Sequence, residues 1–289
     1  MRVAVVGIDG SGKTTVVRRL GARDGVAVVH AIRAHDDPRS PVAGLSRDLA
    51  GASAAADAVG RIQLKAAVLC LQLCLYGPSE RHAAGAARLL LTDRHPLVDP
   101  LVYLPLFGRL AGGGGPGSDV RTWWARQEPD AARAVRDWLA DRTGHTDPWA
   151  LGEELLRLGT RPPEEMLDGL GRRFGVAPPD AVLLLDLPVE QALRRTRERA
   201  GQSELHETAA FLSATRQGYT SVLDRLARAR PDIAQRRVDC RDLDVDEVAH
   251  RIRETIAELD GPSPHPAPIT RPARPPLSGR PCYVRRSEA

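Results

Sequence analysis

The residues with the clearest chemistry lie near the start of the chain, in the stretch "GIDGSGKTT" at positions 7–15. Glycines at positions 7 and 12, followed by Lys13 and Thr14, give the spacing Gly-x-x-x-x-Gly-Lys-Thr directly after the apolar run "RVAVV". Glycines let backbone N–H groups turn toward an anion, and a following helix adds its positive end. The stretch therefore predicts a loop that binds nucleotide phosphates.

Lys13 and Thr14 supply the side-chain chemistry of this loop. The chain has only two lysines, Lys13 and Lys65, against 39 arginines. A slim ammonium group can reach phosphates inside a narrow loop, where the broad guanidinium of arginine fits less well. The hydroxyl of Thr14 is expected to bind Mg²⁺, which keeps most of its other ligands as water and phosphate oxygens.

Two further sets of residues could act on a phosphoryl group. Asp93 and Arg94 end the apolar run "LLLTDRHP", and in a parallel sheet the ends of strands line the ligand crevice. This pair could hold Mg²⁺ and clamp a phosphate, or it could be a surface ion pair. The stretch "LRRTRERAG" (193–201) is rich in arginine and predicts a flap over 194–207 that neutralises a transferring phosphoryl group. The alternative is a solvated basic helix.

Short apolar runs alternate with helix-length stretches along the chain. Strands are expected at 2–7, 25–32, 87–93, 180–187 and 235–240. Helices are expected at 13–24, 55–77, 189–201, 207–229 and 244–259. This alternation predicts an α/β fold with a five-stranded, mainly parallel sheet that helices cover on both faces.

The segment 105–160 interrupts the alternation and predicts a helical insertion reached through the glycine stretch 112–117. Helices are expected at 119–142 and 147–159. The segment holds all four tryptophans of the chain, at positions 123, 124, 138 and 149. They could form a small local core or a wall of the substrate site.

Composition narrows the possible partners. The chain has 289 residues and a formal net charge of +4, and the segment 261–289 carries that excess, with five arginines, one acid and eight prolines. We expect this tail to be disordered and residues 1–260 to form the folded domain, with no nucleic acid as partner. No apolar run is long enough to span a membrane, and no signal peptide is evident, so a cytoplasmic protein is expected. Cys70 and Cys74 are expected to be buried rather than to bind metal.

Several motifs in this order resemble the thymidylate kinases. They are "GIDGSGKTT", "TDRH", "PDAVLLLDL", "RRTRERAG", "FLSATRQGY" and "VDCRDLDVDEV", and together they cover about residues 1–104 and 161–258. The resemblance implies a P-loop kinase that uses ATP and Mg²⁺, and it suggests a homodimer. It assigns Mg²⁺ to Thr14 and Asp93. The residues that it assigns to ATP are Gly7, Gly10, Ser11, Gly12, Lys13, Thr14, Thr15 and, against the adenine, Arg195.

The resemblance also implies roles around the acceptor. Asp9 would face the acceptor sugar, and Arg33 and Arg94 would hold the acceptor phosphate. Arg197 and Arg199 would be catalytic cations of the flap.

The chain departs from that family at the acceptor side. The motif after the second strand reads "RAHDDPRSP" instead of arginine-glutamate-proline-glycine-glycine. The base-stacking phenylalanine of the family falls at Val68, its base-reading arginine falls at Gln72, and its tyrosine near the sugar is displaced to Tyr103. A lost stacking ring removes roughly 1–3 kcal/mol of base binding unless another group replaces it.

These observations predict an ATP-dependent kinase whose acceptor is a nucleoside monophosphate or a related small molecule. If the acceptor group is a phosphate, positioning suffices; if it is a hydroxyl, Asp9 or Asp93 should act as the base. Two alternatives stay open at this point. One is a kinase of a nucleoside or another metabolite, and the other is a nucleotide-binding regulator without turnover.

Overall fold

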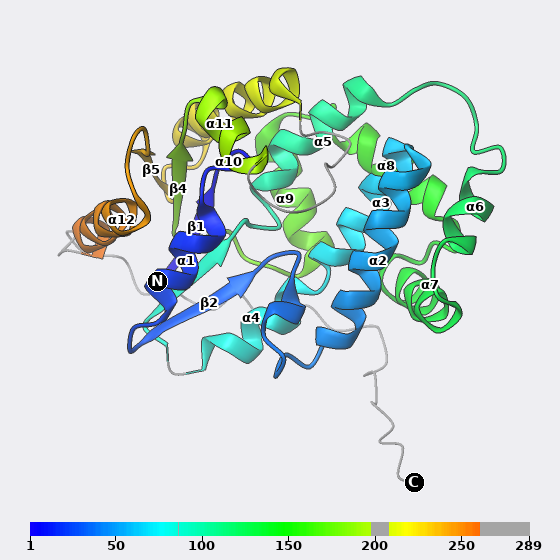
Figure 1. The fold of residues 1–289 in the computed structure, drawn as a ribbon, viewed down its shortest axis with the longest axis horizontal. Helices are drawn as coiled ribbons and strands as arrows, with labels where there is room; N and C mark the ends of the chain where they lie inside the picture. Colours follow the sequence, from blue (N-terminus) through cyan, green and yellow to red (C-terminus); the bar gives the residue numbers. More distant parts are fainter. Residues whose placement is uncertain (86, 198–207, 261–289) are drawn as a thin grey trace, which may run out of the picture.

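The computed structural model describes residues 1–85, 87–197 and 208–260, and a five-stranded sheet forms its centre (Figure 1). The order across the sheet is β2-β3-β1-β4-β5, and each neighbouring pair is parallel. The predicted α/β fold is therefore confirmed. The strands are β1 (Arg2–Val6), β2 (Val26–His30), β3 (Leu89–Asp93), β4 (Ala181–Asp186) and β5 (Ala234–Asp239).

Helices connect the strands and cover both faces of the sheet. A short 3₁₀ helix, η1 (Ala34–Asp36), follows β2. The α-helices are α1 (Lys13–Gly21), α2 (Ala43–Val59), α3 (Ile62–Leu73), α4 (Tyr76–Ala84), α5 (Asp99–Leu110), α6 (Asp119–Ala125), α7 (Pro129–Thr143), α8 (Pro148–Leu158), α9 (Pro163–Phe174), α10 (Val189–Arg197), α11 (Ala209–Ala229) and α12 (Val245–Asp260).

The strands β1, β3 and β4 are apolar runs because both of their faces are largely buried, whereas the edge strand β5 is polar and partly exposed. Val3 and Val5 of β1 belong to one core cluster with α1 and α12, whereas Ala4 and Val6 belong to the other cluster. The second cluster contains residues of α2, α3, α5, α9 and α11. Side chains that alternate between two covered faces explain why β1, β3 and β4 show no polar alternation.

The structure corrects one predicted helix at Gly60. The range 55–77 was expected to be continuous, but α2 ends at Val59 and α3 begins at Ile62. Gly60 adopts a φ of +74° and its N–H bonds to the carbonyl of Ala56 at 3.0 Å. A glycine in this conformation ends a helix at little steric cost, so the chain folds back into two packed helices.

The segment 105–160, predicted to be an insertion, is helical, but the bounds of its helices differ from those expected. The range 119–142 is two helices, α6 and α7, because Pro129 begins the second one and lacks the N–H that would continue the first. Helix α9 was not expected. In Figure 1, α6, α7 and α8 lie beside α2 and α3, away from the sheet.

The tryptophans belong to the core. Trp123 is completely buried and donates its indole N–H to the carbonyl of Ala52 in α2 at 2.8 Å. Trp138 donates in the same way to the carbonyl of Leu71 in α3 at 3.1 Å. The tryptophans therefore join the large core cluster instead of forming a small core of their own, and none of them lines the larger cavity. Two of them tie the segment 105–160 to α2 and α3.

Two smaller expectations concern membranes and cysteines. Among the described helices, none is long and apolar enough to cross a membrane. Cys70 and Cys74 are both buried. Their mutual hydrogen bond, and next their burial, shift the pKa of each thiol. No group of three or more His, Cys, Asp or Glu side chains within the described ranges could hold a metal.

Candidate active site

The loop between β1 and α1 has a backbone that requires glycine at two positions. Gly10 has a φ of +83°, and a Cβ at this position would lie 2.5 Å from the carbonyl oxygen of Ala192. Gly12 has a φ of +87° and caps the N-terminus of α1. Residues with a side chain rarely adopt such positive φ values, so the glycines at positions 10 and 12 follow from the shape of the turn.

Lys13 lies inside this loop and is 5% exposed. Its ammonium donates hydrogen bonds to the carbonyls of Gly7, at 2.9 Å, and Ile8, at 2.8 Å. Burial, and next the charge of Arg94, lower its pKa to about 8, although nearby carboxylates oppose the shift. The group therefore remains charged at neutral pH and lies where the α1 N-terminus also attracts anions.

Asp93 is the centre of a polar cluster at the ends of β2 and β3. It is 4% exposed, so the alternative of a solvated surface ion pair is wrong. Its Oδ2 accepts hydrogen bonds from the hydroxyl of Thr14 and from Nδ1 of His30, the latter at 3.2 Å. Arg33 donates to the Thr14 hydroxyl at 2.8 Å and to Asp93 at 3.3 Å.

The electrostatics of the cluster keep Asp93 ionised. Burial alone would raise its pKa, but the hydrogen bond from His30 and the charge of Lys13 hold the pKa below its ordinary value. The second oxygen, Oδ1, is buried and has no hydrogen-bond partner in the described part of the chain. The Asp93 carboxylate is charged, and one of its two oxygens accepts no hydrogen bond from the described residues. Together with the Thr14 hydroxyl, it forms a set of oxygen ligands that fits Mg²⁺ or its bound waters.

His30 is a site residue that the sequence reasoning missed. Strand pairing places it directly opposite Asp93 across β2 and β3. A signal existed, since His30 is a polar residue near the end of an apolar run, where ligand sites of parallel sheets occur. The pairing of that strand with β3 was not readable from the sequence.

Arg94 joins the phosphate loop to helix α5. It pairs with Asp9 and donates to the hydroxyl of Tyr103 at 3.1 Å. Burial would lower the pKa of Arg94, but the Asp9 carboxylate outweighs this and the pKa is raised. Behind them, the Tyr219 hydroxyl donates to Asp99 at 2.6 Å, and burial raises the pKa of that carboxyl. Asp99 and Tyr219 were also not predicted.

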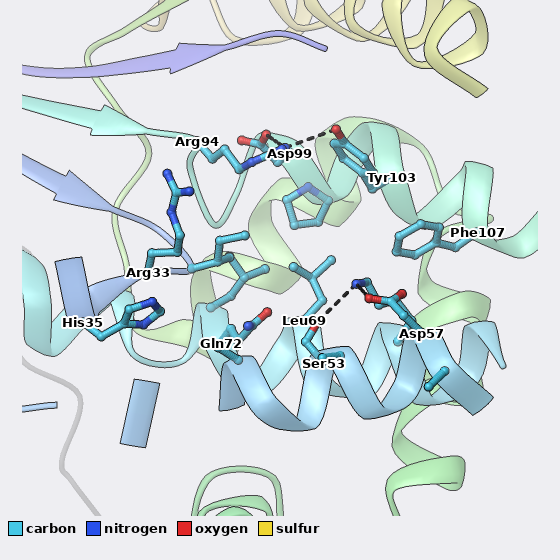
Figure 2. A pocket seen from close by; sticks show the side chains of 17 residues that line it. Arg33, His35, Ser53, Asp57, Leu69, Gln72, Arg94, Asp99, Tyr103 and Phe107 are labelled. Carbon is cyan, nitrogen blue, oxygen red and sulfur yellow. Dashed lines mark hydrogen bonds and ion pairs between the residues drawn. The ribbon is translucent and has the colours of Figure 1, made fainter. Parts of the chain in front are cut away.

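Two neighbouring cavities that share lining residues lie over these residues. The smaller, about 190 Å³, covers the phosphate loop and the Asp93 cluster. The larger, about 720 Å³, lies between α2 and α3 on one side and α5 on the other (Figure 2). Ile32, Arg33 and Arg94 line both. A ligand of up to drug size therefore fits beside a phosphate-binding loop, with two arginines shared by both cavities.

No protein-family model and no curated protein sequence matches this chain. Solved structures do. The chain is similar to thymidylate kinase from Candida albicans, with 16% identity, a TM-score of 0.50, and coverage of 90% of this chain and 91% of that one. It is similar to deoxyadenosine kinase from M. mycoides, bound to dCMP and dCDP, with 13% identity, a TM-score of 0.50, and coverage of 90% and 100%.

The chain shares the fold of these two kinases, a five-stranded parallel sheet flanked by helices with a phosphate loop after β1. Identity this low establishes the fold and leaves the acceptor to the side chains of this chain. Within the P-loop kinase fold, the structure brings together most of the residues predicted for the site. Those that line the smaller cavity are Asp9, Gly10, Gly12, Lys13, Thr14, Arg33, Asp93 and Arg94.

The structure places two of the three residues predicted for the acceptor base and sugar in the larger cavity. Gln72 and Tyr103 line the larger cavity. Val68 does not, because it is completely buried in the core behind α3, and Leu69 lines the cavity instead. The position was counted back from Asp93 and falls one residue from Leu69, the residue of α3 that faces the cavity. None of the four tryptophans lines the cavity.

The donor side continues toward α10. The guanidinium of Arg195 lies beside Gly12, and it donates to the carbonyl of Leu243 at 3.3 Å. Thr15 follows the loop on an exposed face of α1. Arg197 is exposed at the end of α10, whereas Arg199 and the rest of the expected flap lie outside the described residues.

Proposed function

We propose that this protein is an ATP-dependent phosphotransferase that moves the γ-phosphoryl group of ATP to a nucleoside monophosphate or a related small acceptor. The single observation that carries the proposal is the position of the two cavities side by side. A loop fit for nucleotide phosphates lies next to a space large enough for a second molecule, and Arg33 and Arg94 line both. A protein that only binds a nucleotide does not need this second space.

The donor half would use the phosphate loop. Backbone N–H groups of the loop and the ammonium of Lys13 would hold the phosphates of ATP. The Thr14 hydroxyl and the Asp93 carboxylate would hold Mg²⁺ directly or through water, and the bound ion would neutralise charge on the phosphates. The position of Arg195 between Gly12 and Leu243 suits contact with the adenine.

The acceptor half would use Arg33 and Arg94. Both can grip an acceptor phosphate, since Arg33 is partly exposed and Arg94 lines both cavities. A phosphate oxygen is already nucleophilic and needs positioning rather than a base. The lowered pKa of Asp93 makes that carboxylate a weak base, which favours a phosphate acceptor over a hydroxyl. Asp9, paired with Arg94, is the candidate base for a hydroxyl.

Turnover separates this proposal from a nucleotide-binding regulator. ADP release should be measured with ATP and Mg²⁺ over a panel of nucleosides, nucleoside monophosphates and phosphorylated metabolites. We expect release with at least one acceptor and a loss of more than 100-fold in Lys13→Ala. ATP binding without ADP release over the whole panel would support the regulator and refute the kinase.

The flap arginines have their own test. Arg197 and Arg199 are proposed to neutralise the transferring phosphoryl group, so Arg197→Ala should lower kcat more than it weakens ATP binding. Arg194→Ala is the matched control, because Arg194 is exposed on the same helix. If both variants keep the wild-type kcat, the proposed catalytic role of Arg197 is wrong.

A further inference from the structure

The larger cavity has a second polar end, remote from the phosphate loop. Asp57 of α2 and Lys65 of α3 form an ion pair with 2.6 Å between Oδ2 and Nζ, and Lys65 also donates to the hydroxyl of Ser53 at 3.1 Å. All three residues line the cavity. In Figure 2, Asp57 lies on the side opposite Arg33, and the apolar side chain of Leu69 lies between them.

Stability alone does not account for this ion pair. Lys65 is only 8% exposed, so its ammonium has lost most of its water. Replacing a buried pair of this kind by apolar residues of similar size is often neutral or stabilising, because desolvation offsets the attraction. Lys65 is also one of only two lysines in the chain, and both line the neighbouring cavities.

Asp57 has hydrogen-bonding capacity that the described residues do not use. Its Oδ1 is buried without a partner among them, while its side chain as a whole keeps 20% of its surface exposed. An ionised carboxylate accepts about four hydrogen bonds, and rotation about its terminal torsion is soft. A small rotation can therefore present an oxygen to a molecule in the cavity.

The walls between the two polar ends are largely apolar. Leu69 and Leu73 of α3 face Pro100 and Phe107 of α5 across the cavity. Phe107 packs against Tyr103 with 5.9 Å between ring centroids, so the aromatic surface lies on the α5 side. A flat or compact apolar body fits between these walls, with its reacting group at Arg33 and Arg94 and its far end near Asp57.

We infer that the acceptor carries a hydrogen-bond donor, an N–H or O–H group, at the end remote from its reacting group, and that Asp57 binds this donor. This inference rests on the proposed function for the position of the reacting group. Lys65 orients Asp57 through their ion pair, and Ser53 accepts a hydrogen bond from Lys65. The acceptor class is a phosphate monoester with an apolar or aromatic body and a distal donor. An acceptor that ends in an apolar group leaves the Asp57 carboxylate desolvated without compensation, and binds more weakly.

Matched ligand pairs test the inference by direct binding. The pairs are dAMP with its N6-dimethyl analogue, dTMP with its N3-methyl analogue, and 4-hydroxyphenethyl phosphate with phenethyl phosphate. Calorimetry should show that wild-type protein binds the donor-bearing member of at least one pair roughly 10–100-fold more tightly, the range for a hydrogen bond to a charged group. Asp57→Asn should reduce that ratio to below about threefold.

Two further variants separate recognition from structure. The double variant Asp57→Leu with Lys65→Met removes the pair without leaving an unpaired charge, so it should fold with an unchanged or higher Tm. Its affinities for the donor-bearing and the donor-free ligand of a pair should nevertheless become similar. Asp48→Asn is the control, because Asp48 is on α2 but does not line the cavity. An equal ratio in wild type and Asp57→Asn, or no binding of any probe by wild type, would overturn the inference.

ADP release in parallel distinguishes the two proposals. The protein could bind donor-bearing ligands more tightly than donor-free ones in a way that depends on Asp57, yet release no ADP with the same compounds. That result refutes the kinase and supports the distal site. ADP release that is indifferent to the distal donor and to Asp57→Asn supports the kinase and refutes the site.

Discussion

At the scale of single residues, the site is organised by charges that burial would make costly unless they were paired. Lys13, Asp93 and Arg94 are all nearly or largely buried, and each retains its charge because an opposite charge or several hydrogen bonds lie within reach. Such preorganised charges suit a reaction whose main demand is neutralisation of phosphate. The same burial and pairing shift the pKa values of these groups, so a pH dependence of binding is expected.

The lowered pKa of Lys13 predicts a pH dependence of ATP binding. The ammonium should lose its proton above pH 8 and with it the attraction for phosphate, so the Kd for ATP should rise by up to tenfold per pH unit. Calorimetry between pH 7 and 10 measures this, and Lys13→Met should show weak binding that varies little over the range.

Unfolding does not explain this loss, because the sign for stability is opposite. The folded-state pKa of Lys13 lies below the unfolded one, so the cost of burying its charge is fully present below about pH 8 and is relieved as the pH rises through both values. A falling Tm that tracks the rise in Kd would contradict the assignment to Lys13.

Gly10 offers a second prediction at this scale. Gly10→Ala forces a Cβ to within 2.5 Å of the carbonyl oxygen of Ala192 in a left-handed conformation, so the loop must shift. We expect a loss of stability of about 1–3 kcal/mol and at least tenfold weaker ATP binding. Urea unfolding and calorimetry measure the two effects. Gly44→Ala in α2, where a Cβ meets no atom within 4 Å, should be neutral or stabilising.

At the scale of elements, the large cavity depends on how α2 and α3 are held. These helices carry Asp57, Lys65 and Leu69 into the cavity wall, and their opposite sides pack against the insertion. Trp123 ties α6 to α2, and Trp138 ties α7 to α3. The insertion therefore acts on the site indirectly, through the position of two helices.

Trp123→Phe tests this bracing. The variant removes the hydrogen bond to the Ala52 carbonyl and part of a fully buried ring, and we expect a loss of about 2 kcal/mol in the free energy of unfolding. Because the residue does not line either cavity, ATP affinity should stay within about twofold of wild type. Trp124→Phe, a partly exposed neighbour on α6, should cost less. Equal losses in the two variants would argue against a bracing role specific to Trp123.

At the scale of the whole molecule, an ion-pair cluster joins separate parts of the fold at the end of β4. Asp186 accepts two hydrogen bonds from Arg216 of α11, at 2.6 and 3.0 Å, and two from Arg237 of β5, at 3.0 and 2.5 Å. Burial would raise the pKa of Asp186, but the two arginines outweigh it and lower the pKa. The cluster fastens β5 and α11 to the sheet.

Asp186→Asn should therefore lower stability at neutral pH by roughly 1–2 kcal/mol, because Asp186 is buried but its partners Arg216 and Arg237 are 33% and 53% exposed and solvent screens them. Because the pKa of Asp186 is lowered on folding, its contribution is present above the ordinary aspartate pKa of about 3.9 and is lost as the pH falls below that value. Urea unfolding should thus show that the free energies of unfolding of wild type and Asp186→Asn become equal at low pH. Asp168→Asn removes an exposed partner of Arg230 and should cost under about 1 kcal/mol.

The sequence alone determined the features that depend on local chemistry. The glycine pattern of the phosphate loop follows from the backbone conformation of its glycines, and the apolar runs of β1, β3 and β4 follow from burial on both faces of the sheet. Asp93 and Arg94 were also found because strand ends line ligand sites in this fold class.

Tertiary structure decided what depends on contacts between distant segments. The pairing of β2 with β3 brings His30 to Asp93, and the break at Gly60 turns one expected helix into two that face each other. That fold-back sets Asp57 against Lys65 and puts Leu69, rather than Val68, on the cavity wall. Hydrophobic periodicity leaves such placements open, because several packings bury the same apolar faces equally well and only the assembled core selects one.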